Sequence, residues 1–198
     1  MSFSQDFLKK TALVAETLDV ECLEKMAILL AQVREQGGRV FFVGSGGGAG
    51  HASHAVCDFR KLAGIQAICP TDNVSELTAR INDEGWESSI AESLKCSGLC
   101  ARDAVFVFSV GGGNEEKNIS ANLVHAVRTA KSVGAKVLGV VGRNGGFTAA
   151  HADACVIVPT VDPALVTPLT EAYQAVVWHL LVSHPLVQKN TAKWESAP

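Results

Sequence analysis

The chain has 198 residues, of which 47% are hydrophobic and 19% are charged, and its formal net charge is −3. This composition excludes a disordered chain and predicts a well-buried globule. A charge so close to zero gives no electrostatic footprint for nucleic acid or for a membrane surface. The length suits one α/β domain over residues 1–198.

The N-terminus lacks a basic segment followed by an apolar one, and no apolar run reaches membrane-spanning length. We therefore expect a cytoplasmic protein. The six cysteines are scattered and none forms a CxxC pair. Small hydrophobic thiols in a reducing compartment explain them better than disulfides or a zinc cluster.

Residues 4–36 carry apolar side chains at helical spacing and stop at Gly37-Gly38. They predict two helices, or one helix bent near Asp19. A helical segment of this length before the first strand has no place in the simplest nucleotide-binding fold. We expect residues 1–36 to pack against another subunit.

The first strand is expected at 39–43 and runs directly into the glycine-rich turn 44–48. Glycines let the backbone N–H groups approach an anion, and a helix from Ala49 would point its positive end at the same place. A plain tight turn is the simpler alternative. The turn also matches the dinucleotide pattern G-x-G-x-x-A, but the next strand ends without an acidic residue until Asp72.

Along the expected helix, His54 and Asp58 stand four residues apart and so share one face. They can approach one metal ion or one proton together. A lone pair of this kind is more often a surface ion pair, so the interpretation depends on further partners.

The rest of the core, to residue 185, repeats strands and helices, and residues 186–198 form a tail. The third strand runs into Gly111-Gly112-Gly113-Asn114 and a helix from about Glu116 to Val133, which repeats the first unit. Helices are also expected at 74–81 and 86–94. The pattern predicts a doubly wound, five-stranded parallel sheet flanked by helices. Its expected strands are 39–43, 66–69, 103–109, 135–142 and 154–159.

The last expected helix, from Thr170 to about Val182, is apolar but carries Glu171 and His179. A single histidine there is more often a hydrogen-bonded core residue than a ligand. Together with His54 and Asp58, the set has the composition of a divalent-metal site or of an acid/base pair.

In chain order, the segments FVGSGGGAGHASHAVCDF, INDEGW, FVFSVGGGN, VLGVVGRNGG and TEAYQAVVWHLL resemble the sugar-isomerase (SIS) domain family, and within it the phosphoheptose isomerases. The likeness runs from about residue 5 to about residue 185. The helical His-x-x-x-acid after the glycine turn, combined with an acid eight residues before a late histidine, is more specific than any single glycine turn.

The resemblance implies a zinc-dependent, homotetrameric enzyme with sites between subunits. It would convert sedoheptulose 7-phosphate to D-glycero-D-manno-heptose 7-phosphate through an enediol. Asp58 and His179 would be catalytic, and His54, Asp58, Glu171 and His179 would hold the metal. The substrate and its phosphate would meet Ser45, Gly46, Gly47, Gly48, Asp83, Ser109, Gly111, Gly112 and Asn114.

This sequence departs from the family pattern at several of these positions. Asp58 is one methylene shorter than the usual glutamate, and Glu171 replaces an amide. The second glycine loop has fewer hydroxyls and is longer, and Pro168 replaces a common acidic residue. Glu171 and His179 would lie about 12 Å apart along an ideal helix, which leaves Glu171 as a ligand or as a residue behind the ligands. The alternative function is a non-catalytic protein of this family that binds a sugar phosphate or a regulatory partner protein.

Overall fold

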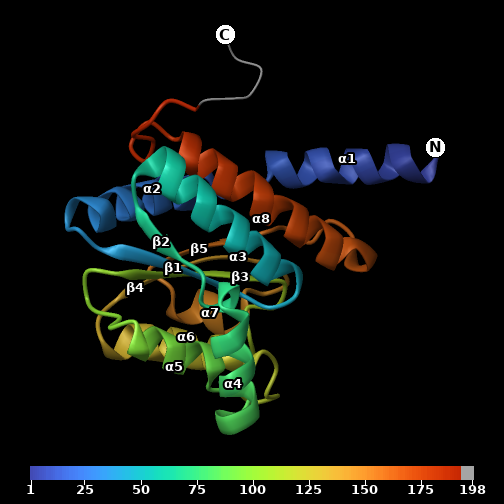
Figure 1. Cartoon of the computed structure of the whole chain (residues 1–198). Helices are drawn as coiled ribbons and strands as arrows, with labels where there is room; N and C mark the ends of the chain where they lie inside the picture. The colour runs from blue at the N-terminus through green and yellow to red at the C-terminus, as the bar shows by residue number, and fades with distance from the viewer. Residues whose placement is uncertain (193–198) are drawn as a thin grey trace.

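A computed structural model gives the fold and describes residues 1–192. Five strands form one parallel sheet in the order β2-β1-β3-β4-β5 (Figure 1). The predicted five-stranded parallel sheet is therefore confirmed. The strands are β1 (Arg39–Gly44), β2 (Gln66–Ile68), β3 (Ala104–Ser109), β4 (Lys136–Val141) and β5 (Ala154–Ile157).

Helices cover both faces of the sheet, which is why the central strands are apolar on both sides. Alternate residues of each strand enter two separate core clusters: Phe42 and Phe106 face one layer, and Phe41 and Val105 face the other. The first layer contains α2 (Val20–Glu35), α3 (Gly47–Asp58) and α8 (Val166–Ser183). The second contains α5 (Ser89–Cys96), α6 (Ala121–Ser132) and α7 (Gly146–His151).

The N-terminal segment forms two helices. α1 (Phe3–Glu16) extends away from the body of the molecule (Figure 1), and α2 begins where the Asp19 carboxylate accepts a hydrogen bond from the Cys22 amide. Of the two expected alternatives, two helices and one helix bent near Asp19, the structure has two helices. Phe3 and Leu8 on α1 are exposed. The use of this segment between subunits remains a prediction.

Several helix boundaries differ from those expected; among them, α5 begins at Ser89, three residues after the expected residue 86, and α3 begins at Gly47 instead of Ala49. The helix expected from Glu116 begins only at Ala121, because the Asn114 side chain accepts a hydrogen bond from the Lys117 amide and holds the chain in a turn. α4 (Val74–Glu84) continues to Glu84, and Gly85 ends it at φ 90°. Asp83, expected in a loop, therefore lies in the last helical turn. α8 starts at Val166, four residues before the expected Thr170.

Short segments complete the described chain: a π-helix η1 (Phe59–Ala63) and two 3-10 turns, η2 (Pro70–Asp72) and η3 (Pro163–Leu165). Within residues 1–192, no helix combines the length and apolar character that crossing a membrane requires. The last six residues of the expected C-terminal tail, 193–198, lie outside the described residues.

Candidate active site

Helix α3 positions the first two candidate ligands, and its glycines set where it starts. A β-carbon on Gly48 would lie 2.4 Å from the carbonyl oxygen of Phe108, so α3 can begin against the end of β3 only with glycine there. At its other end, α3 passes directly into the π-helix η1, and Asp58 is the last α-helical residue. Such π-helical turns occur frequently at functional sites.

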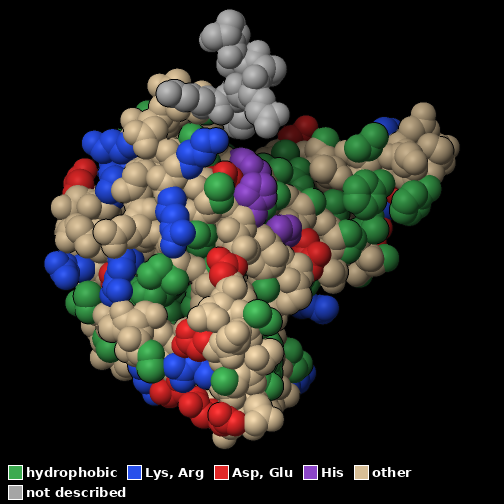
Figure 2. Space-filling view, in the orientation of Figure 1, with side chains coloured by type: hydrophobic (Ala, Val, Ile, Leu, Met, Phe, Trp, Pro, Cys, Tyr) green, Lys and Arg blue, Asp and Glu red, His purple; other side chains and the backbone are tan. Residues whose placement is uncertain are grey.

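The structure brings His54, Asp58 and His179 together, with one ligand atom of each within 4.8 Å of the others. The Oδ2 atom of Asp58 lies 3.5 Å from Nε2 of His179 and 3.8 Å from Nε2 of His54. The two imidazoles are half exposed, whereas the carboxylate is mostly buried. Figure 2 shows histidine side chains gathered at the surface of the molecule. The cluster joins α3 and α8, as the sequence predicted for these three residues.

Buried neighbours orient these groups. The indole Nε1 of Trp178 donates a hydrogen bond to Oδ2 of Asp58 at 3.0 Å. Nδ1 of His179 donates to the carbonyl oxygen of Ala175 at 2.8 Å, which leaves the lone pair on Nε2, the atom nearest Asp58. A second hydrogen bond of this kind is what fixes the tautomer of a metal-bound histidine.

The donor set fits a divalent ion. Two imidazole nitrogens and one carboxylate oxygen are one of the ligand sets of catalytic zinc sites, which keep a fourth position open. Bonds of about 2.0–2.1 Å in tetrahedral geometry place ligand atoms about 3.4 Å apart. The separations of 3.5 and 3.8 Å from the Asp58 oxygen are close to that value.

Glu171 lies elsewhere. A β-carbon on Gly47 would be 2.6 Å from Oε1 of Glu171, so the carboxylate rests against the first residue of α3. Within residues 1–192, the three-residue cluster does not include it. The wide helical separation of Glu171 from His179 accounts for this placement, which, of the two expected roles, favours that of a residue behind the ligands.

The two predicted phosphate-side serines bind within the protein. Oγ of Ser45 accepts a hydrogen bond from the Asn122 side chain at 3.0 Å, and Oγ of Ser109 accepts one from the Gly112 amide at 3.0 Å. Ser109 is also buried. Asp83 is exposed on α4, where its carboxylate accepts a hydrogen bond from Asn82. The substrate roles of Ser45, Ser109 and Asp83 remain predictions.

The other predicted phosphate-binding residues lie in the two glycine turns. Gly46 precedes α3 at φ 58°, with Gly47 and Gly48 in the first helical turn. Gly111, Gly112 and Asn114 follow β3, and an antiparallel bridge joins Asn114 to Ile119. The turns lie close together, since the Ser45 hydrogen bond to Asn122 connects the first turn to the start of α6.

His51 lies beside the cluster, against Trp178, and was not singled out from the sequence. The Gln174 amide donates to the carbonyl of Val140 at 3.3 Å, so its oxygen is left to accept a hydrogen bond from Nδ1 of His51 at 2.8 Å. Nε2 of His51 therefore carries the lone pair. His51 packs near Trp178, with ring centroids 5.2 Å apart. Its position three residues before His54 on the expected helix was the signal available in the sequence.

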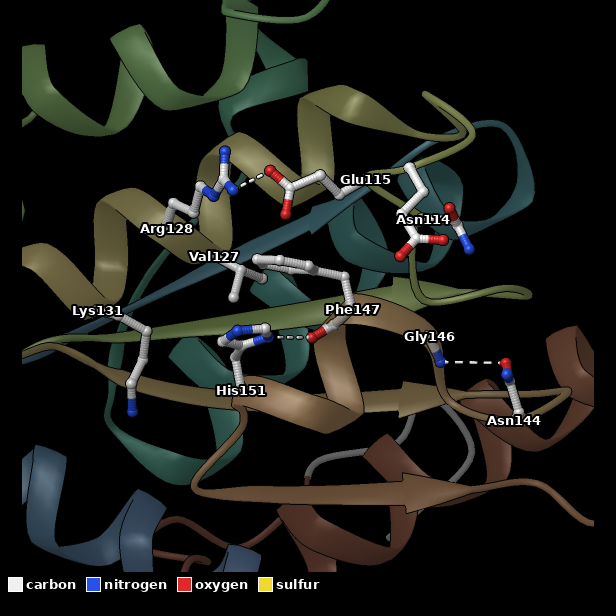
Figure 3. A pocket seen from close by; sticks show the side chains of 11 residues that line it. Asn114, Glu115, Val127, Arg128, Lys131, Asn144, Gly146, Phe147 and His151 are labelled. Atoms are coloured by element: carbon white, nitrogen blue, oxygen red, sulfur yellow. Dashed lines mark hydrogen bonds and ion pairs between the residues drawn. The ribbon is translucent and has the colours of Figure 1, made fainter.

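Two cavities flank the second glycine loop. One, of about 480 Å³, lies between the loops that follow β3 and β4 and includes Lys117, Ser120, Arg143 and Thr167, none of them predicted. The other, of about 530 Å³, lies beyond Asn114 (Figure 3). In the second cavity, Phe147 stacks on His151 at 3.9 Å between ring centroids, and the Arg128 guanidinium lies 5.5 Å from the Phe147 ring. Both faces of that ring are thus covered.

Residues 5–142 match the SIS domain family. The chain is 30% identical over 163 residues to the phosphoheptose isomerase of Rhodospirillum rubrum, covering 80% of each chain. It is 31% identical over 191 residues to the lincomycin biosynthesis protein LmbN of Streptomyces lincolnensis, covering 93% of this chain and 69% of LmbN.

Solved structures show the same likeness. The phosphoheptose isomerase GmhA of Neisseria gonorrhoeae superimposes with a TM-score of 0.78 at 25% identity, over 91% of this chain and 95% of that chain. The Francisella tularensis phosphoheptose isomerase shares the fold, with a TM-score of 0.76 at 21% identity over 92% and 97% of the two chains. The chain therefore belongs to the SIS domain family.

Proposed function

We propose that the chain is a phosphosugar isomerase that interconverts a ketose phosphate and an aldose phosphate. The first candidate reaction is sedoheptulose 7-phosphate to D-glycero-D-manno-heptose 7-phosphate, in a cytoplasmic homotetramer. The observation that carries the proposal is the convergence of His54, Asp58 and His179 from two helices beside the glycine turns. The named phosphoheptose isomerases among its relatives support the reaction class. The likeness to LmbN, a lincomycin biosynthesis protein, is compatible with a different sugar phosphate as the substrate.

The reaction moves one proton between C1 and C2 of the sugar. A base removes the proton from C1 of the ketose, an enediol forms, and the proton returns at C2 while the oxygens exchange a proton. Asp58 is the proposed base because its carboxylate lies at the centre of the cluster. His179 is the proposed partner that exchanges the oxygen proton, because its Nε2 lone pair faces the cluster.

A divalent ion, proposed to be zinc, would be held by Nε2 of His54, Oδ2 of Asp58 and Nε2 of His179. When bound, such an ion polarises the substrate oxygens and stabilises the negative charge that develops on them. Trp178 fixes the Asp58 carboxylate from the core side through its indole N–H. The two half-exposed imidazoles leave the opposite side of the cluster open to a substrate.

The test combines metal analysis with turnover of sedoheptulose 7-phosphate by the zinc-loaded protein, followed by NMR in deuterated water. We expect stoichiometric metal and deuterium incorporation at C2 of the product. His179→Ala should abolish incorporation. His151→Ala, a histidine on α7 at the other face of the sheet, serves as the matched control and should retain it. Full activity of His179→Ala would refute the catalytic role, and no turnover of any ketose phosphate by the wild type would refute the isomerase.

A further inference from the structure

The cavity of about 480 Å³ lies beyond the carboxyl ends of β3 and β4, where ligands of open α/β sheets bind. Lys117 and Arg143 enter it from two different loops. Among the described residues that line it, none carries a carboxylate. Ser120 and Thr167 add hydroxyl groups. The lining is therefore positively charged and rich in hydrogen-bond donors.

Both cations of this cavity are available. In the part of the chain that the structure describes, neither Lys117 nor Arg143 forms an ion pair. The cations of the neighbouring cavity differ, since Arg128 pairs with Glu115 and Lys131 lies 3.4 Å from Asp153. Of these two cavities, the first therefore has unpaired positive charge for an anionic ligand.

A carboxylate already lies at the first glycine turn, where the substrate phosphate was expected. The Glu171 carboxylate rests against Gly47 at the positive end of α3, where it takes the place of an external anion. A dianion at this turn would meet a carboxylate at close range, which is unfavourable.

The backbone of the two loops is held in an unusual conformation. Asn118, Ser120 and Arg143 adopt left-handed φ values of 50°, 51° and 53°. Ser120 and Arg143 line the cavity, and Asn118 follows Lys117 directly. Non-glycine residues in this region cost energy and concentrate at ligand sites. Over residues 1–192, the amides of Gly111 and Gly113 have no protein acceptor, so they can donate to a ligand in the cavity they line.

We propose that Lys117 and Arg143 bind the phosphate group of the sugar phosphate in this cavity, together with the Gly111 and Gly113 amides. The proposal rests on the proposed function and assigns the phosphate to a pair of cations in place of the serines. The Ser45 to Asn122 hydrogen bond ties the first glycine turn to the start of α6, directly after Ser120, so the cavity adjoins the turn that leads into α3. A dianionic phosphate ester is the ligand that two cations and free amides select.

Binding of inorganic phosphate, measured by calorimetry at low ionic strength, tests the site without any turnover. The variants are Lys117→Gln, Arg143→Gln and Arg143→Lys. None of them adds or removes a β-carbon, so the strain at position 143 is unchanged. Arg102→Gln is the matched control. Arg102 is exposed at the opposite end of β3, and its substitution changes the net charge by the same amount. Thermal unfolding checks that each variant is folded.

Each Gln variant should weaken phosphate binding about 10- to 100-fold, the effect of losing one charged hydrogen bond. Arg143→Lys should restore part of the loss, and Arg102→Gln should bind like the wild type. KM for the sugar phosphate should rise in parallel, with a smaller change in kcat. Phosphate binding that is absent from the wild type, or retained by both Gln variants, overturns the proposal. So does weakened phosphate binding with an unchanged KM. If phosphate binding behaves as expected but no sugar phosphate turns over, the anion site stands and the isomerase function fails.

Discussion

Trp178 donates its indole N–H to Oδ2 of Asp58, so a side chain that is only 2% exposed fixes the carboxylate shared by two solvent-exposed imidazoles. The carboxylate cannot turn away from the histidines without leaving that N–H buried and unpaired. Removal of the N–H should therefore loosen the cluster while the core remains packed.

Trp178→Phe keeps an aromatic ring and removes the donor. We expect zinc affinity, measured by competition with a chelator, to fall about 10- to 100-fold, as for other residues that orient metal ligands. Trp86→Phe is the control, because Trp86 is 42% exposed and should leave the affinity unchanged. Equal zinc affinity in wild type and Trp178→Phe would show that the indole does not orient Asp58.

Glu171 and Asp58 should differ in their effects on the metal. Asp58→Ala removes the central ligand and should lower zinc affinity by at least about tenfold. Glu171→Gln should leave it unchanged, because the Glu171 carboxylate rests against Gly47 and not in the cluster. Chelator competition measures both. A tenfold loss in Glu171→Gln would place that residue among the ligands.

The glycines of α3 should respond in opposite directions. Gly48→Ala places a β-carbon 2.4 Å from the backbone oxygen of Phe108 and should cost about 1–3 kcal/mol of unfolding free energy. Gly50→Ala meets no atom within 4 Å and lies inside the helix, so it should stabilise by about 0.5–1 kcal/mol. Urea unfolding compares the two. Similar effects of both substitutions would contradict the close approach of α3 to β3.

Asp103 should make the free energy of unfolding depend on pH in the acidic range. Burial raises the pKa of Asp103, but hydrogen bonds from the Arg39 guanidinium and from the Arg39 and Cys100 amides outweigh it and hold the pKa below its ordinary value. The folded protein therefore favours the ionised form. Its stabilisation is complete above an unfolded-state pKa of about 3.9 and is lost as the pH falls through the lower folded-state pKa.

Asp103→Asn should cost about 2–4 kcal/mol at pH 7, because the side chain is 2% exposed and leaves the Arg39 charge without its partner. The cost should shrink at pH 3 and below. Urea unfolding at both pH values measures the difference. Asp72→Asn, at an exposed carboxylate, is the control and should show neither effect. A cost for Asp103→Asn that does not change with pH would contradict the assignment.

The strands could be predicted because strands covered on both faces have apolar runs, and a glycine or a proline lies at or within two residues of each carboxyl end. His54 and Asp58 could be paired because helical spacing alone sets their common face. His179 joined them through composition and the family resemblance. The start of α6 could not be predicted. The Asn114 side chain accepts a hydrogen bond from the Lys117 amide, which holds the residues before α6 in a turn. The pairing of Lys117 with Arg143 could not be predicted, because only the folded loops bring the two residues to one cavity.

The parallel sheet has a kinetic consequence. Arg39 at the start of β1 and Asp103 just before β3 are 64 residues apart in sequence, and β1 lies between β2 and β3 in the sheet. The chain must close that long loop before the pairing of β1 with β3 returns any free energy. During synthesis, β1 cannot pair with β3 until β3 has left the ribosome, and an unpaired strand edge of this kind makes a nascent chain prone to aggregation.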